Sequence, residues 1–156
     1  MSKRVLYVDR APRDERELNM THSVLLKLRE KYDVKIQTDL DTDTIDLLAG
    51  EAKNNRAYDS LLTHVPFNRG SRASGDALVG LSEREFYEKI YSRSLSVLKK
   101  IKEDFSKMPI LAYTGADNGA VMDRLLREVT DGVIFKSLEC DIDAIKIGMA
   151  LERLLA

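Results

Sequence analysis

Short runs of branched and aromatic residues alternate along this chain with longer segments in which apolar residues recur every three or four positions. Runs of the first kind are typical of strands buried on both faces, and the second spacing is typical of amphipathic helices. The expected strands cover residues 4–9, 33–38, 59–65, 109–114 and 132–136. Because right-handed crossovers lay such strands parallel with helices on both sides, the alternation predicts an α/β fold. Its centre is a doubly wound, five-stranded parallel sheet in a three-layer sandwich.

Helical spacing also predicts which positions face the core. Leu18 and Val24 belong to the apolar side of the first expected helix. Ile142, Ile145 and Met149 form the apolar side of the last one, so we expect these side chains to be buried.

The sequence contains residues that typically begin a helix at two places. Ser82 followed by Glu85 is a capping box, and it opens a helix whose apolar positions continue to Ile101. Asp141 or Asp143 is expected to open the last helix.

The length of 156 residues fits one core and predicts a single domain covering 1–156. The 25 basic and 26 acidic residues leave a formal net charge of -1, so the protein as a whole has no electrostatic attraction to nucleic acid or an acidic membrane. Cys140 is the only cysteine, so an intramolecular disulfide is excluded, and the first apolar run is too short for a signal peptide or a membrane span. We therefore expect a cytoplasmic protein with no membrane association and no direct nucleic-acid binding.

One connection is longer than the loops usual in α/β domains. Residues 67–81, after the third expected strand, are rich in Gly and Ser and contain Arg69 and Arg72. Because glycine frees backbone N–H groups and arginine supplies charge, these two arginines are candidate anion contacts. We favour an insertion without a ligand, since the segment has neither a P-loop nor a dinucleotide fingerprint.

Polar residues stand at the carboxyl ends of four expected strands, where parallel α/β sheets place their ligand sites. Asp9 and Arg10 follow the first strand, His64 the third, Thr114 the fourth and Lys136 the fifth. Since these ends share one edge of the sheet, we expect the five residues to line a common pocket.

This set of residues resembles the receiver domain of two-component response regulators, and the resemblance covers essentially the whole chain. Receivers have a flavodoxin-like fold with paired acidic residues after the first strand and a phosphorylated aspartate ending the third. A Thr or Ser ends their fourth strand and a Lys their fifth. Asp9, Thr114 and Lys136 match three of those positions.

Other positions depart from the family's pattern. Arg10 stands where the second acidic residue, a main magnesium ligand, is usual, and Ser137 stands where a proline commonly follows the lysine. The aromatic switch position is Val133. His64 occupies the place of the phosphorylated aspartate, and the alternative register puts Leu62 there, so neither register supplies an aspartate.

The chemistry that the resemblance implies lacks essential groups here. Aspartyl phosphorylation needs a carboxylate nucleophile and a divalent cation held by oxygen ligands. The nucleophile is missing, and Arg10 removes a ligand while adding positive charge, so we expect no cofactor, no metal site and doubtful magnesium binding. We hypothesise instead that Arg10 and Lys136 pair with Asp9 and hold the pocket in one state.

His64 itself has three readings: a phosphoacceptor, a metal ligand, or a replacement that has lost the family's function. The only other histidine is His22, within the first expected helix, which disfavours a transition-metal site. We favour the third possibility, a replacement that has lost the family's function.

The expected function is that of a degenerate receiver, a signalling module rather than an enzyme, which acts through protein contacts without aspartyl phosphorylation. By analogy of fold, its partner is a signalling protein, an output domain or a second copy, bound at the region from Asp117 to Ala156. Two alternatives stay open. One is a small-molecule or nucleotide-binding protein that uses the crevice at the carboxyl edge, and the other is a receiver phosphorylated unconventionally.

Overall fold

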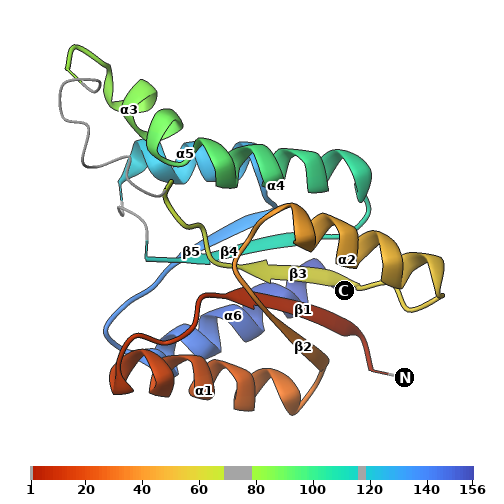
Figure 1. The fold of residues 1–156 in the computed structure, drawn as a ribbon. Coiled ribbons are helices and arrows are strands. Elements are labelled where there is room, and N and C mark those ends of the chain that lie inside the picture. Colours follow the sequence, from red (N-terminus) through yellow and green to blue (C-terminus); the bar gives the residue numbers. More distant parts are fainter. Residues whose placement is uncertain (1, 69–78, 116–118) are drawn as a thin grey trace.

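The computed structural model describes residues 2–68, 79–115 and 119–156, and it contains a five-stranded parallel sheet (Figure 1). The strand order is β2-β1-β3-β4-β5, with every neighbouring pair parallel. The strands are β1 (Arg4–Asp9), β2 (Asp33–Thr38), β3 (Ser60–Thr63), β4 (Ile110–Thr114) and β5 (Gly132–Phe135). The predicted fold class is confirmed, and each strand lies within or on the bounds expected from the sequence.

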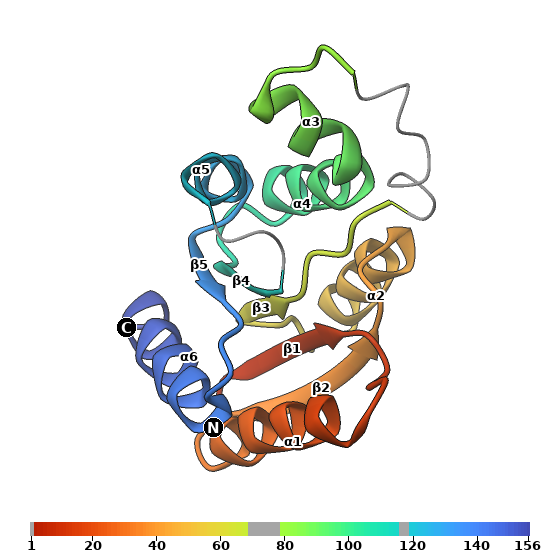
Figure 2. The same cartoon turned by 90° about the vertical axis from the view of Figure 1, so that its left-hand side faces the viewer.

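Helices cover both faces of the sheet (Figure 2). On one face lie α1 (Glu15–Arg29) and α6 (Cys140–Leu154), which pack against each other. On the other face lie α2 (Thr42–Lys53), α4 (Ser92–Asp104) and α5 (Ala120–Val129), with α3 (Glu83–Ile90) packed against α4 and α5. None of the helices in the described ranges is long and apolar enough to cross a bilayer.

Each face of the sheet has its own hydrophobic core, because side chains alternate between the faces along a strand. In β1, Val5 and Tyr7 pack toward α1 and α6, whereas Leu6 and Val8 pack toward the helices of the opposite layer. All four side chains are almost fully buried. A continuous apolar strand is therefore what a sheet covered on both sides requires.

The single helix expected after Ser82 is divided into α3 and α4 at Tyr91, and this prediction was wrong. The cause is Asn68, whose backbone N–H donates to Ile90 O and whose side-chain amide donates to Lys89 O. The Oδ1 atom of Asn68 also accepts the backbone N–H of Arg93. Asn68 thus occupies groups that a continuous helix would pair internally, and such insertions bend or break helices.

The start of α3 agrees with its sequence signal. Ser82 is the N-cap, its side chain accepts the Glu85 N–H, and the Glu85 side chain accepts the Ser82 N–H. Of the long connection at 67–81, residues 69–78 lie outside the described residues, and so do the candidate anion contacts Arg69 and Arg72.

The buried side of α6 differs from the prediction. Ile142, Ile145 and Met149 are about half exposed or more, at 47%, 52% and 67%, while Ala144 and Ile147 face the core. The expected cap is also wrong, since Glu139 precedes the helix.

The reason for this rotation is Asp143, which is fully buried within the first turn of α6. Its polar contacts, described below, turn that side of the helix inward. Leu18 of α1, expected in the core, is likewise 54% exposed, because the core side of α1 consists of Val24, Leu25 and Leu28.

Candidate functional site

The carboxyl ends of β1, β3, β4 and β5 bring four of the predicted residues together. The ammonium group of Lys136 lies 3.3 and 3.2 Å from the two carboxylate oxygens of Asp9. The Nδ1 atom of His64 lies 3.7 Å from the Oδ1 atom of Asp9. Thr114 is joined to Lys136 through the backbone, since Lys136 N–H donates to Thr114 O at 2.7 Å. Asp9 is thus the common neighbour of Lys136 and His64 at this edge.

The Asp9 carboxylate is saturated with donors from within the chain. Besides the Lys136 ammonium, Oδ1 accepts the backbone N–H of Arg10 at 2.8 Å and Oδ2 accepts the Tyr7 hydroxyl at 3.1 Å. The residue is 6% exposed. A buried carboxylate is stable only with such partners. A metal ion that used Asp9 as a ligand would have to displace some of these contacts.

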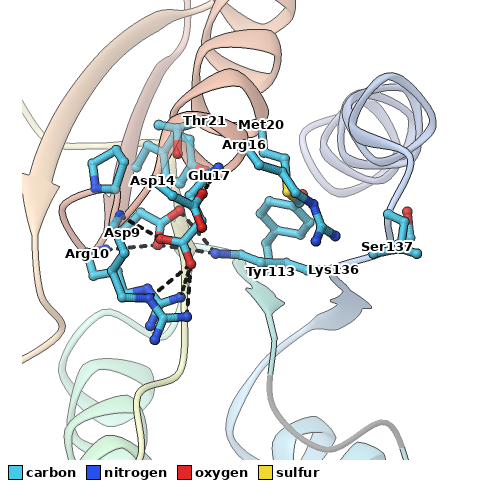
Figure 3. Close-up of a pocket in the computed structure, with 14 residues that line it drawn as sticks. Asp9, Arg10, Asp14, Arg16, Glu17, Met20, Thr21, Tyr113, Lys136 and Ser137 are labelled. Atoms are coloured by element: carbon cyan, nitrogen blue, oxygen red, sulfur yellow. Dashed lines mark hydrogen bonds and ion pairs between the residues drawn. The ribbon is translucent and has the colours of Figure 1, made fainter.

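The side chain of Arg10 does not pair with Asp9, so that part of the predicted arrangement was wrong. Its Nη2 atom lies 2.5 Å from Oε1 of Glu17, in the first turn of α1 (Figure 3). Nη2 of Arg13 lies 3.0 Å from the same oxygen. The hydrogen bonds from Arg13, together with the nearby charge of Arg10, lower the pKa of Glu17 to about 2. A guanidinium finds a better partner in this half-buried glutamate than in an aspartate already engaged by lysine.

His64 continues the sheet beyond the end of β3, since its backbone N–H donates to Val8 O. The residue is 5% exposed, and burial lowers its pKa to about 4, against the smaller opposing effect of the Asp9 charge. The imidazole is therefore neutral at pH 7. Its Nε2 atom is buried without a hydrogen-bond partner in the described part of the chain.

Thr114 is buried at the end of β4, and its hydroxyl lies 3.5 Å from Val65 O. The hydroxyl is thus turned toward the segment that follows His64. Thr114 thus ends the fourth strand, as predicted.

A buried polar network lies next to Lys136, and its residues were not predicted from the sequence. The Tyr113 hydroxyl donates to Oδ2 of Asp143 at 2.8 Å, and Ser137 donates to Asp143 twice, from its backbone N–H at 2.9 Å and from its hydroxyl at 2.7 Å. The Lys136 ammonium lies 5.2 Å from the centre of the Tyr113 ring. Asp143 therefore ties the residue after the lysine to α6.

A signal for part of this network was present in the sequence. A proline at 137 has no N–H to donate, so a serine there leaves a donor available. Burial and the Asp143 contact raise the pKa of the Tyr113 hydroxyl, and burial beside Asp9 raises that of Tyr7. Both phenols therefore act as hydrogen-bond donors at neutral pH.

Two cavities flank the Asp9–Lys136 pair and share Arg10, Arg13 and Lys136 as lining residues. The first, about 350 Å³, lies between the start of α1 and the segment from Lys136 to Leu138 (Figure 3). The second, about 360 Å³, lies on the side of His64 and Thr114. Within the described ranges, no three His, Cys, Asp or Glu side chains gather in a way that could hold a metal ion.

No family model matches the sequence, and no curated protein does. Solved structures do match in fold. An orphan response regulator of H. pylori is 16% identical with a TM-score of 0.59, over 99% of this chain and 98% of that one. A CheY-like response regulator receiver domain protein from Methanospirillum hungatei is 19% identical with a TM-score of 0.51, over 99% and 97%.

NtrX from Brucella abortus, solved in complex with ADP, is 20% identical with a TM-score of 0.56. The match covers 99% of this chain but 27% of the NtrX chain, so this chain spans about a quarter of that protein. At such identities the likeness shows the fold, which is that of response-regulator receivers.

Proposed function

We propose that this chain is a receiver-like signalling module that acts through protein contacts and does not depend on aspartyl phosphorylation. The receiver fold supports the first half of the proposal, as an analogy between architectures. The second half depends on one observation: at the carboxyl end of β3 stands His64, a buried neutral imidazole, and no carboxylate.

The surroundings of His64 support the same conclusion. A hard cation such as magnesium needs oxygen ligands, but the carboxylate of Asp9, 3.7 Å from His64, already accepts hydrogen bonds from Lys136 and Tyr7. Arg10 stands at the sequence position where a second carboxylate would be needed. A cation at this point would compete with Lys136 for the oxygens of Asp9, which supports the proposal.

The contact surface that we propose is the outer side of α6. Ile142, Ile145 and Met149 lie there with spacings of three and four residues, each about half exposed or more. Exposed apolar side chains grouped on one helix are typical of surfaces that bind another protein. The partner is a signalling protein, an output domain or a second copy of this chain.

The test of phosphorylation independence uses small phosphoryl donors. The ¹⁵N-labelled protein is mixed with magnesium and either acetyl phosphate or beryllofluoride, and its amide spectrum is compared with that of the untreated protein. We expect the Thr114 and Lys136 amide resonances to stay in place and mass spectrometry to detect no phosphoryl adduct. A shift of the Thr114 amide with beryllofluoride would contradict the proposal.

The same experiment distinguishes a receiver that is phosphorylated on His64 from one that is not phosphorylated. Phosphorylation of His64 would give a phosphoramidate adduct that is lost in acid and absent from the His64→Asn variant. Such an adduct would replace the proposed function with phosphorylation at histidine.

A second candidate function is small-molecule binding at the carboxyl edge. The observation that favours it is the pair of cavities of about 350 and 360 Å³ on the two sides of Lys136. These volumes fall at the lower end of the range of roughly 300–1,000 Å³ that ligand pockets occupy.

A further inference from the structure

In the cavity between α1 and the β5–α6 connection, the acidic side chains have partners within the chain, whereas one basic side chain has none among the described residues. The cavity's acidic side chains are all engaged within the chain: Asp9 with Lys136, and Glu17 with Arg10 and Arg13. The third acid, Asp14, caps α1 by accepting the Glu17 N–H. Each of these three carboxylates therefore already accepts at least one hydrogen bond from within the chain.

Arg16 is the exception on the basic side. It lines the cavity from the first turn of α1, and its side chain has no hydrogen bond or ion pair with any described residue. Figure 3 shows its guanidinium reaching toward the side of the cavity that Tyr113 and Ser137 line. A guanidinium in this position offers paired N–H donors to a planar anion, and a carboxylate matches that geometry.

The remaining walls of the cavity include apolar groups. Met20 and Pro12 line it on the α1 side, and Leu138, which is 78% exposed, lines it on the other. A shallower groove continues outward past Met20 and Leu138, and Asp14, Glu15 and Arg16 also line it. Once Arg16 is paired with a ligand carboxylate, the two acids of the groove favour an uncharged tail and disfavour a second negative charge.

We infer that this cavity binds a small monocarboxylic acid with an aliphatic body, whose carboxylate pairs with Arg16 and whose body lies against Met20 and Leu138. The inference rests on the second of the two proposed functions and names its ligand class. The site lies on the α1 side of the Asp9–Lys136 pair, away from His64 and Thr114.

Hexanoate is the probe that tests this inference on the full chain. Two molecules of the same length serve as controls: hexanamide, which has no charge, and adipate, which has a carboxylate at both ends. In titrations followed by ¹H–¹⁵N spectra, we expect hexanoate to shift the amide resonances of Arg16, Met20 and Ser137. Hexanamide and adipate should each bind more weakly, the first without the guanidinium contact and the second because of Glu15.

The matched variants are Arg16→Gln and Arg29→Gln. Both residues are exposed arginines of α1, and Arg29 lies at the opposite end of the helix without a partner in the described residues. Loss of a charged hydrogen-bond pair should weaken hexanoate binding about tenfold in Arg16→Gln. Arg29→Gln should bind as the unmodified protein does.

Several results would overturn the inference: equal binding of hexanoate by both variants, tighter binding of adipate than of hexanoate, or no shift with hexanoate. Inorganic phosphate and AMP are titrated in parallel to locate the failure. If either of them shifts the Met20 and Ser137 resonances and hexanoate does not, the ligand class is wrong and small-molecule binding stands. If none of the probes shifts any resonance, the small-molecule candidate fails as well.

Discussion

The Nδ1 atom of His64 lies 3.7 Å from the Asp9 carboxylate, and yet the imidazole stays neutral because burial outweighs the attraction of that charge. The Lys136 ammonium on the same carboxylate contributes to this result by opposing a second positive charge nearby. The pocket thus holds one buried ion pair and one neutral ring.

This arrangement predicts acid sensitivity. The pKa of His64 is about 4 in the folded protein and 6.5 for an ordinary histidine, so the unfolded chain binds the extra proton first as pH falls. The free energy of unfolding should therefore decrease between about pH 6.5 and pH 4, by roughly 3 kcal/mol at most from this residue. Urea denaturation at a series of pH values measures the effect.

His64→Asn provides the comparison, since asparagine is polar and does not titrate. Its stability should change less than that of the unmodified protein over the same pH interval. The control is His22→Asn, because His22 is an exposed residue of α1. The stability of this variant should depend on pH as that of the unmodified protein does. Parallel curves for all three proteins would contradict a buried neutral His64.

The ion pair between Asp9 and Lys136 makes a second prediction. Lys136→Met leaves a carboxylate that is 6% exposed without its counter-ion, which should cost about 2–3 kcal/mol of unfolding free energy. The double variant Asp9→Asn, Lys136→Met should lose less than the sum of the single changes, with a coupling of about 1 kcal/mol or more. Additive losses would show that the pair contributes nothing beyond its separate side chains.

Asp143 should be the most sensitive polar position of α6. Asp143→Ala removes the acceptor of Tyr113 and of both Ser137 donors, which should cost about 3 kcal/mol, while Tyr113→Phe removes one contact and should cost about 1 kcal/mol. Asp141→Ala, an exposed acid of the same helical turn, is the control and should change stability little. Thermal or urea denaturation measures all three.

Magnesium binding should return when carboxylates are supplied. The double variant Arg10→Asp, His64→Asp adds two oxygen ligands beside Asp9 and removes a guanidinium, so calorimetry should detect Mg²⁺ binding. Under the same conditions, we expect no binding by the unmodified protein. Equal binding by the two proteins would show that the substitutions at positions 10 and 64 are not what prevents metal coordination.

The strand ends of the site could be predicted from sequence because strand periodicity fixes where each strand stops, and parallel strands place those stops at one edge. Asp9, His64, Thr114 and Lys136 are together for this reason. The partner of Arg10 could not be predicted, since Glu17 lies on the next helix and competes with Asp9 only once α1 is in place.

Apolar spacing predicted the wrong buried side of a helix where a polar side chain has buried contacts. In α6, Ile142, Ile145 and Met149 have helical spacing, but the contacts of Asp143 with Tyr113 and Ser137 determine which side is buried. Such a contact joins positions far apart in sequence, which periodicity does not detect.

The position of Asp143 on α6 also has a thermodynamic consequence. The helix that presents Ile145 and Met149 to solvent is the same one that holds Ser137, the neighbour of Lys136. If a ligand in the pocket changes the affinity of a partner for that outer side by some factor, the partner must change the affinity of the pocket for the ligand by the same factor. The strength of a ligand's effect could then be measured from the partner's side alone.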